Sequence, residues 1–289
     1  MKQVKGYFLL LILAAIVETA WSQKITAEIH QDGSFDIIGS KIQITNCYPA
    51  LNNQSLKVLS VKISEKATEK TIQYNLMEGM LELKFSYEGN ALAINTKLSG
   101  LTTIPEIISP VHDALVIGAN RVYRTPWGIS GNGGIKDWPE NSMKNSDCSS
   151  ITGLLNDSGA ALVISTRDYT KYASFTNLYP IQMNSGKRLI DVCIKTEQVS
   201  VDKIPTYYFT ENVSAYDAMR NEATEAALFM GAKNDKPQTY HWCSWYYAYF
   251  HFSDKLVTEY LNGFKRVTPE VKIQTFQIDA GFSPHVGDW

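Results

Sequence analysis

The sequence predicts a mainly β protein, in which a large antiparallel β-sandwich is followed by a strand–helix–strand unit. Three observations lead to this class. Between residues 24 and 210, short stretches of apolar residues alternate with turn sequences, as in antiparallel sheets. A helical pattern follows over 214–230. Near the end, two strand-like segments enclose an amphipathic helix, which is typical of a βαβ unit with parallel strands.

Turn sequences locate the strands of the sandwich. Asp32-Gly33 lies between apolar stretches at 25–30 and 35–38, which predicts a hairpin. The segment 80–87 alternates cleanly, so one face of that strand carries Leu81, Leu83, Phe85 and Tyr87. After the turn at 88–90, Leu92, Ile94 and Leu98 continue the alternation. Further strands are predicted at 151–155, 160–166, 188–194 and 206–210, with a turn at 156–159.

The segment 123–145 differs from the rest of the sandwich. It is rich in glycine, proline, asparagine and charged residues, so we expect a long loop, and long loops often carry function. Two tryptophans, Trp127 and Trp138, lie in it. They either pin the loop to the sandwich or reach a binding site.

A helix is predicted over 214–230. Ser214 and Asp217 resemble a capping box at its start, and Gly231 is placed to end it. The polar, proline-containing stretch 233–238 is a candidate linker, so we place the domain boundary after residue 235. The expected apolar stripe of the helix consists of Tyr216, Met219, Ala223, Ala226, Ala227 and Met230.

The stretch 240–289 contains the clearest functional signals. A short run crowded with aromatic residues comes first, and a helix capped by Ser253 follows. The helix carries one apolar face and stops at Thr268-Pro269. The second strand, 273–278, ends in Asp279. The apolar face of the helix is formed by Leu256, Val257, Tyr260, Leu261 and Phe264.

Ligands of βαβ units bind at the carboxyl ends of the strands. Trp242, Trp245 and Asp279 fall at these ends. Indole rings suit the apolar C–H faces of a sugar and a carboxylate suits its hydroxyl groups, so the pattern indicates carbohydrate binding. In the alternative, the aromatic side chains form core and Asp279 is a cap or turn residue.

The N-terminus has the anatomy of a secretory signal peptide. Lys2 and Lys5 precede an apolar run at 7–17, which is too short to span a membrane. Ala20 and Ser22 suit the −3 and −1 positions, so cleavage before Gln23 is expected. The protein is then periplasmic or extracellular. The sequons at Asn53, Asn156 and Asn212 matter only if a eukaryote makes it.

The four cysteines, Cys47, Cys148, Cys193 and Cys243, are widely and irregularly spaced. That spacing argues against a zinc site, and we expect no metal and no cofactor. We expect free buried thiols or at most one disulfide bond. A catalytic pair of Cys243 with His241 is a minor alternative. The net charge of −2 does not favour nucleic acid or an anionic membrane as a partner; the oligomeric state is not indicated.

Three motifs in the last 50 residues resemble the first two barrel strands of the family 36 α-galactosidases. They are WCSWYY at 242–247, QIDxG at 277–281 and GDW at 287–289. The resemblance implies a β-sandwich followed by the start of a (β/α)8 TIM barrel. The organisation is then a signal peptide at 1–22, a β-sandwich domain with a C-terminal helix at 23–235, and the incomplete barrel at 236–289.

The resemblance also implies an activity, the retaining hydrolysis of terminal α-galactosides in an oligosaccharide or glycoside. It assigns substrate binding to Asp279, Trp242, Trp245, Asp288 and Trp289. The two catalytic aspartates of the family follow the fourth and sixth strands of a barrel that takes about 250 residues. We therefore expect no catalytic residue in this chain and a continuation past Trp289.

One position departs from the family. The usual Asp-Asp-Gly is Asp279-Ala280-Gly281 here, so strict galactose specificity is in doubt. Two further readings stay open. One is a secreted carbohydrate-binding sandwich without catalysis, and the other is an α-galactosyl transferase of the raffinose-synthase type.

Overall fold

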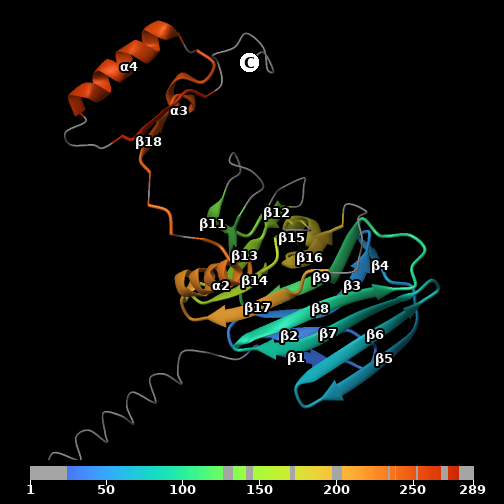
Figure 1. Cartoon of the computed structure of the whole chain (residues 1–289). Coiled ribbons are helices and arrows are strands. Elements are labelled where there is room, and N and C mark those ends of the chain that lie inside the picture. The colour runs from blue at the N-terminus through green and yellow to red at the C-terminus, as the bar shows by residue number, and fades with distance from the viewer. Residues whose placement is uncertain are drawn as a thin grey trace, which may run out of the picture. The chain divides into compact units, whose positions relative to one another are not determined.

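The computed structural model describes residues 25–125, 133–140, 146–169, 173–196, 204–233, 235–237, 239–251, 253–267 and 273–279. The chain divides into two compact units, one up to Ala232 and one from Lys233 onward (Figure 1). The signal peptide, Trp127, Asp288 and Trp289 lie outside the described residues. None of the helices among the described residues combines the length and the apolar character that a membrane-spanning helix requires.

The first unit contains two antiparallel sheets. The first sheet, called sheet A, runs in the order β1-β2-β3-β9-β16-β15-β12, and β4 pairs with β3. Its strands are β1 (Thr26–Ile29), β2 (Phe35–Ile38), β3 (Gln43–Leu51), β4 (Gln54–Ser55), β9 (Ile107–Ile117), β12 (Ser146–Ser149), β15 (Ala173–Leu178) and β16 (Leu189–Lys195). A short 3₁₀ helix, η1 (Gln182–Asn184), joins the last two.

The second sheet, called sheet B, runs in the order β11-β10-β13-β14-β17-β8-β7-β6-β5. Apolar side chains from both sheets form one continuous core, so the mainly β, sandwich-like class predicted from the sequence is confirmed. The strands are β5 (Val58–Lys66), β6 (Glu69–Leu76), β7 (Met80–Glu88), β8 (Ala91–Ser99), β10 (Arg121–Arg124), β11 (Gly134–Asp137), β13 (Ile151–Leu155), β14 (Ala161–Thr166) and β17 (Tyr207–Asn212).

The strands with the clearest alternation are where the sequence places them. Strands β1 and β2 pair from Thr26 opposite Ile38, and Gly33 in their turn has a φ of +86°, which a side chain would strain. In β7, the side chains of Leu81, Leu83 and Phe85 face the core and are at most 1% exposed. Period-2 patterning with one buried face is therefore a reliable signal in this chain.

The prediction of a long loop over 123–145 is wrong in part. Strands β10 and β11 form an antiparallel pair from Arg121 opposite Asp137 to Arg124 opposite Gly134. Trp138 is 2% exposed in the core, and its indole N–H donates to the carbonyl of Tyr179 at 3.0 Å. This tryptophan pins the segment to the sandwich. Strand β11 is a polar edge strand without buried side chains, so the sequence carries no alternation to mark it.

Helix α2 (Ala215–Phe229) packs on the outer face of sheet B. Its predicted ends are confirmed, since Ser214 accepts the N–H of Asp217 at 3.2 Å and Gly231 has a φ of +61°. The predicted stripe is wrong in part, because Tyr216 is 71% exposed. The buried positions are Ala218, Glu222 and Ala226. The buried face of the helix includes Glu222, whereas a hydrophobic pattern assigns every glutamate to the exposed face. The predicted face is therefore rotated from the observed one.

The second unit is the predicted βαβ arrangement. Strands β18 (His241–Cys243) and β19 (Thr275–Gln277) pair in parallel, with Trp242 opposite Phe276. Between them lie α3 (Trp245–Ala248) and α4 (Asp254–Val267). The N–H of Leu256 donates to Ser253 at 3.3 Å, which confirms that cap.

Candidate functional site

The carboxyl ends of β18 and β19 carry Asp279, one of the residues that the sequence analysis assigned to sugar binding. Cys243 and Gln277 are partners at the ends of the two parallel strands. The N–H of Asp279 donates to the hydroxyl of Ser244 at 2.9 Å, and Ser244 is fully buried. Asp279 is thereby held beside the end of β18, which is how parallel strand ends form a site.

The carboxylate of Asp279 has a thiol neighbour. Sγ of Cys243 lies 3.4 Å from Oδ2 of Asp279, within reach of a weak S–H···O hydrogen bond. Cys243 is half-buried and forms no disulfide. A catalytic role with His241 finds no support, because the thiol contacts a carboxylate and the imidazole is exposed. The thiol therefore belongs to the surroundings of Asp279.

Trp242 is half-buried and packs against other aromatic side chains of the second unit. Its ring stacks on Phe276 at a centroid distance of 4.3 Å and contacts Tyr260 at 4.7 Å. Phe264 adds an edge-on contact at 5.6 Å. These partners come from β19 and α4, so the arrangement favours packing for Trp242. Its assignment to the sugar site stays a prediction.

Trp245 begins α3 among aromatic side chains that are largely exposed. Its ring contacts Tyr249 at 5.5 Å and Phe250 at 5.0 Å, both edge-on. Tyr246 and Tyr247 of α3 are 79% and 70% exposed. Trp242 and Trp245 are both half-buried, and Trp245 differs in that the aromatic side chains around it are exposed. Asp288 and Trp289, the other predicted binding residues, lie outside the described residues.

The first unit holds a polar groove of about 830 Å³ that the sequence analysis missed. The guanidinium of Arg167 lies in its wall, where Nε is 3.0 Å from Oε1 of the buried Glu222. Glu88 and Glu225 approach the same guanidinium at 3.6 and 3.8 Å. These residues come from β7, the end of β14 and α2, so no local motif marks the groove. Its charged groups are largely paired with one another.

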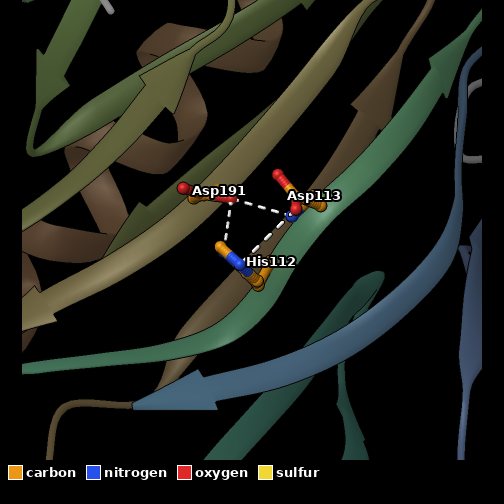
Figure 2. A group of neighbouring side chains, drawn as sticks. All are labelled: His112, Asp113 and Asp191. Carbon is orange, nitrogen blue, oxygen red and sulfur yellow. Dashed lines mark hydrogen bonds and ion pairs between the residues drawn. The ribbon is translucent and has the colours of Figure 1, made fainter. Parts of the chain in front are cut away.

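A second polar cluster lies on neighbouring strands β9 and β16 of sheet A. Figure 2 shows His112 and Asp113 beside Asp191. Nδ1 of His112 is 2.9 Å from Oδ1 of Asp191, and Nε2 is 3.5 Å from Oδ2 of Asp113. The N–H of Asp113 donates to Asp191 at 2.8 Å, and the hydroxyl of Tyr179 donates to its other oxygen at 2.5 Å. Asp191 is fully buried, whereas the side chain of Asp113 is 59% exposed.

Two buried thiols lie inside the sandwich. Cys47 and Cys193 are free and almost fully buried. Burial raises the pKa of the Cys47 thiol well above its ordinary value. The expectation of free thiols is confirmed for Cys47, Cys193 and Cys243, while the side chain of Cys148 lies outside the described part.

No protein-family model matches the sequence, and no curated protein matches it. Solved structures are similar in fold. The ligand-free α-N-acetylgalactosaminidase NagBb from Bifidobacterium bifidum has a TM-score of 0.52 and 8% identity over 73% of this chain and 38% of its own. Its GalNAc complex has a TM-score of 0.53 and 7% identity over the same shares. The α-galactosidase TtGalA from Thermus thermophilus, in complex with stachyose, has a TM-score of 0.41 and 13% identity over 80% of this chain and 45% of its own.

Sequence identities of 7% and 8% are low, so these comparisons show a similar fold and nothing more. The chain spans 38% of the length of NagBb. Over 73% of its length, the chain is therefore similar in fold to part of that α-N-acetylgalactosaminidase.

Proposed function

We propose that the chain is part of a secreted glycoside hydrolase that acts, with retention, on terminal α-galactosides or α-N-acetylgalactosaminides. The observation that carries the proposal is the position of Asp279 after β19, held against the end of β18 by Ser244. The motifs around these residues resemble those of the family 36 α-galactosidases. The likeness in fold between 73% of the chain and an α-N-acetylgalactosaminidase supports the same class independently.

In this proposal Asp279 binds sugar hydroxyl groups. A carboxylate accepts short, charge-assisted hydrogen bonds from hydroxyls, and these are stronger than bonds between neutral groups. The half-buried ring of Trp245 offers its remaining aromatic surface to the apolar C–H face of the sugar. The side chain of Cys243 limits how the carboxylate can turn.

Ala280 stands where the resembled family has a second carboxylate. A site that lacks one hydrogen-bonding group distinguishes less strongly between substrates that differ in a polar substituent. Galactose and N-acetylgalactosamine differ at C2, where one has a hydroxyl and the other an acetamido group. Both classes of α-glycoside therefore belong in the first assay.

Bond cleavage with retention requires two carboxyl groups about 5 Å apart, one as nucleophile and one as acid and base. The resemblance places these groups after later barrel strands. The residues of this chain then bind and orient the sugar, and a water molecule completes the hydrolysis of the glycosyl intermediate.

The test uses the whole protein from its natural source, with its intact mass measured first. Its N-terminus is predicted at Gln23. Turnover of p-nitrophenyl α-galactoside and p-nitrophenyl α-N-acetylgalactosaminide is then compared with that of the Asp279→Asn variant. We expect a large loss of kcat/KM with an unchanged circular dichroism spectrum. Glu259→Gln, on the exposed side of α4 with its side chain 61% exposed, is the matched control and should stay at the wild-type level.

Three other results of this assay would change the proposed function. Wild-type turnover in Asp279→Asn would remove Asp279 from the sugar site. Binding of either sugar without turnover by the whole protein would replace the hydrolase with a carbohydrate-binding module. Transfer to an added sugar acceptor in preference to water would make it a transferase of the raffinose-synthase type.

A further inference from the structure

The cluster of His112, Asp113 and Asp191 depends on an irregularity in sheet A. Between β9 and β16, Ile190 pairs with Ala114 and Val192 with Val111. Two residues, His112 and Asp113, therefore oppose the single residue Asp191, which is the pattern of a β-bulge. In a regular strand, neighbouring side chains point to opposite faces. The bulge instead brings both side chains towards Asp191 (Figure 2).

The backbone at the bulge adopts a conformation that costs energy. Asp113 has a φ of +48°, in the left-handed region that few residues other than glycine and asparagine favour. In that conformation its N–H reaches Asp191 at 2.8 Å. The arrangement thus places a nitrogen and two carboxylates within one small volume. One donor atom from each residue can be chosen so that all lie within 4.8 Å of one another.

One ring nitrogen of the His112 imidazole has no hydrogen-bond partner. Its side chain is 10% exposed, and Nδ1 is buried without a hydrogen-bond partner although Oδ1 of Asp191 is 2.9 Å away. A buried polar atom without a partner costs free energy. The contact is close, but the two atoms are not aligned for a hydrogen bond. A ligand placed beside Nδ1 would satisfy it and would also contact Oδ1 of Asp191, which already accepts the N–H of Asp113.

Asn177 contributes a second polar atom without a hydrogen-bond partner near this cluster. It lies directly opposite Asp191 in the register of β15 and β16, so the two side chains are on the same face. Its Oδ1 is also buried without a hydrogen-bond partner. An amide oxygen is a further ligand that divalent cations accept.

We propose that His112, Asp113 and Asp191 form a site for a divalent transition-metal cation, such as Zn²⁺, with the amide oxygen of Asn177 as a fourth ligand. A tetrahedral cation with bonds of about 2.0–2.2 Å to nitrogen and carboxylate oxygen holds neighbouring ligand atoms about 3.4 Å apart. Nδ1 of His112 and Oδ1 of Asp191 are 2.9 Å apart, so the two atoms separate by about 0.5 Å when the cation binds. Asp113 is half-exposed and can turn to close the site.

The donor set selects the class of cation. A neutral imidazole nitrogen suits zinc, nickel and copper, whereas magnesium and calcium prefer oxygen ligands alone. The hydroxyl of Tyr179 orients Asp191 from behind, as an outer hydrogen bond does for a ligating carboxylate.

A bound cation would join two strands at their bulge. It would lie in the first unit and would not require the proposed glycosidase activity. Since it binds the folded protein and not the unfolded chain, it should raise the Tm by mass action.

The experiment titrates zinc chloride into the whole protein after treatment with EDTA and dialysis, followed by calorimetry and thermal unfolding. We expect one equivalent to bind and the Tm to rise with zinc concentration. Asp113→Asn should weaken binding by at least about tenfold. Asparagine tolerates the positive φ and Asp113 is half-exposed, so this variant should keep the fold. His112→Gln should lose binding as well.

His30→Gln is the matched control. His30 is 3.2 Å from Asp36, and this His–Asp pair of the described residues involves the end of β1 and β2, not β9 and β16. This variant should bind zinc like the wild type. Absence of a one-to-one complex, equal affinity in Asp113→Asn, or an equal loss in His30→Gln would each overturn the proposal. Binding of calcium or magnesium with no zinc binding would also overturn it.

Discussion

The carboxylate of Glu211 accepts the backbone N–H of Ser40 at 2.6 Å and the hydroxyl of the same residue at 2.8 Å. Its other oxygen accepts the N–H groups of Lys41 and Ile42, both at 2.9 Å. Glu211 belongs to β17 of sheet B, and the turn that it binds joins β2 to β3 of sheet A. One buried side chain therefore links the two sheets through four hydrogen bonds.

Replacing Glu211 with glutamine should destabilise the protein by about 2 kcal/mol or more. The amide keeps one acceptor but turns an NH₂ group towards the N–H donors of the turn. Urea unfolding of the whole chain measures the loss. Glu65→Gln is the control, since that side chain is 51% exposed, and it should change stability little. Equal stability of wild type and Glu211→Gln would show that the turn satisfies its N–H groups in another way.

Glu222→Met should cost about 3–5 kcal/mol, because it leaves Arg167 in a buried position without its closest partner. The hydroxyl of Ser165, which donates to Glu222 at 2.7 Å, also loses its acceptor. In Arg167→Met/Glu222→Met, both charges are removed together. A double-mutant cycle in urea should show that the double variant recovers much of the stability. An additive cycle would mean that the two side chains do not depend on each other.

Trp242→Ala should loosen the second unit while leaving the first intact. The indole contacts Phe276, Tyr260 and Phe264, and removing a tryptophan from such a cluster costs about 3 kcal/mol. Limited proteolysis should then cut between residues 239 and 279, with the β-sheet circular dichroism unchanged.

Trp245→Ala is the comparison for that variant, because it leaves the Trp242 cluster in place. It should resist proteolysis like the wild type and, under the proposed function, weaken substrate binding. The assignments of the two tryptophans would be reversed if Trp242→Ala kept its protease resistance and lost only substrate affinity.

The reactivity of the thiols should follow their burial. With Cys148 replaced by serine, one thiol, that of Cys243, should react with Ellman's reagent in the folded protein, and three should react in denaturant. Cys47 stays a protonated thiol at pH 8, since burial raises its pKa, and only the thiolate reacts. Prompt reaction of all three without denaturant would contradict the buried positions of Cys47 and Cys193.

Local patterns in the sequence predicted the sandwich-like fold because each pattern reflects a local physical cause. Leu81, Leu83 and Phe85 alternate since every second side chain of a strand meets the core. Ser214 and Ser253 cap helices through bonds to N–H groups two or three residues away. Asp279 was placed beside the end of the first barrel strand by a rule of topology, namely that the carboxyl ends of parallel strands lie side by side, and the structure adds Cys243 and Ser244 as its neighbours.

Local patterns did not predict the polar residues that are buried against partners far away in the sequence. Glu222 looks like the outer side of a helix until Arg167 and Ser165 are placed beside it. Trp138 was left between two interpretations until the carbonyl of Tyr179 gave its indole a partner. The expectation of no metal rested on cysteine spacing and gave no weight to a histidine and two aspartates that lie up to 79 residues apart.

The amino-acid sequence by itself determined the predominance of strands, the caps of the helices and the order of the strand–helix–strand unit, because these depend on neighbours along the chain. The tertiary structure decided which polar groups are buried and with which partners, in particular Glu211 with Ser40 and His112 with Asp191. Those pairings depend on how the sheets stack and where β9 bulges. A pattern along the sequence does not show which residues far apart in the chain come into contact.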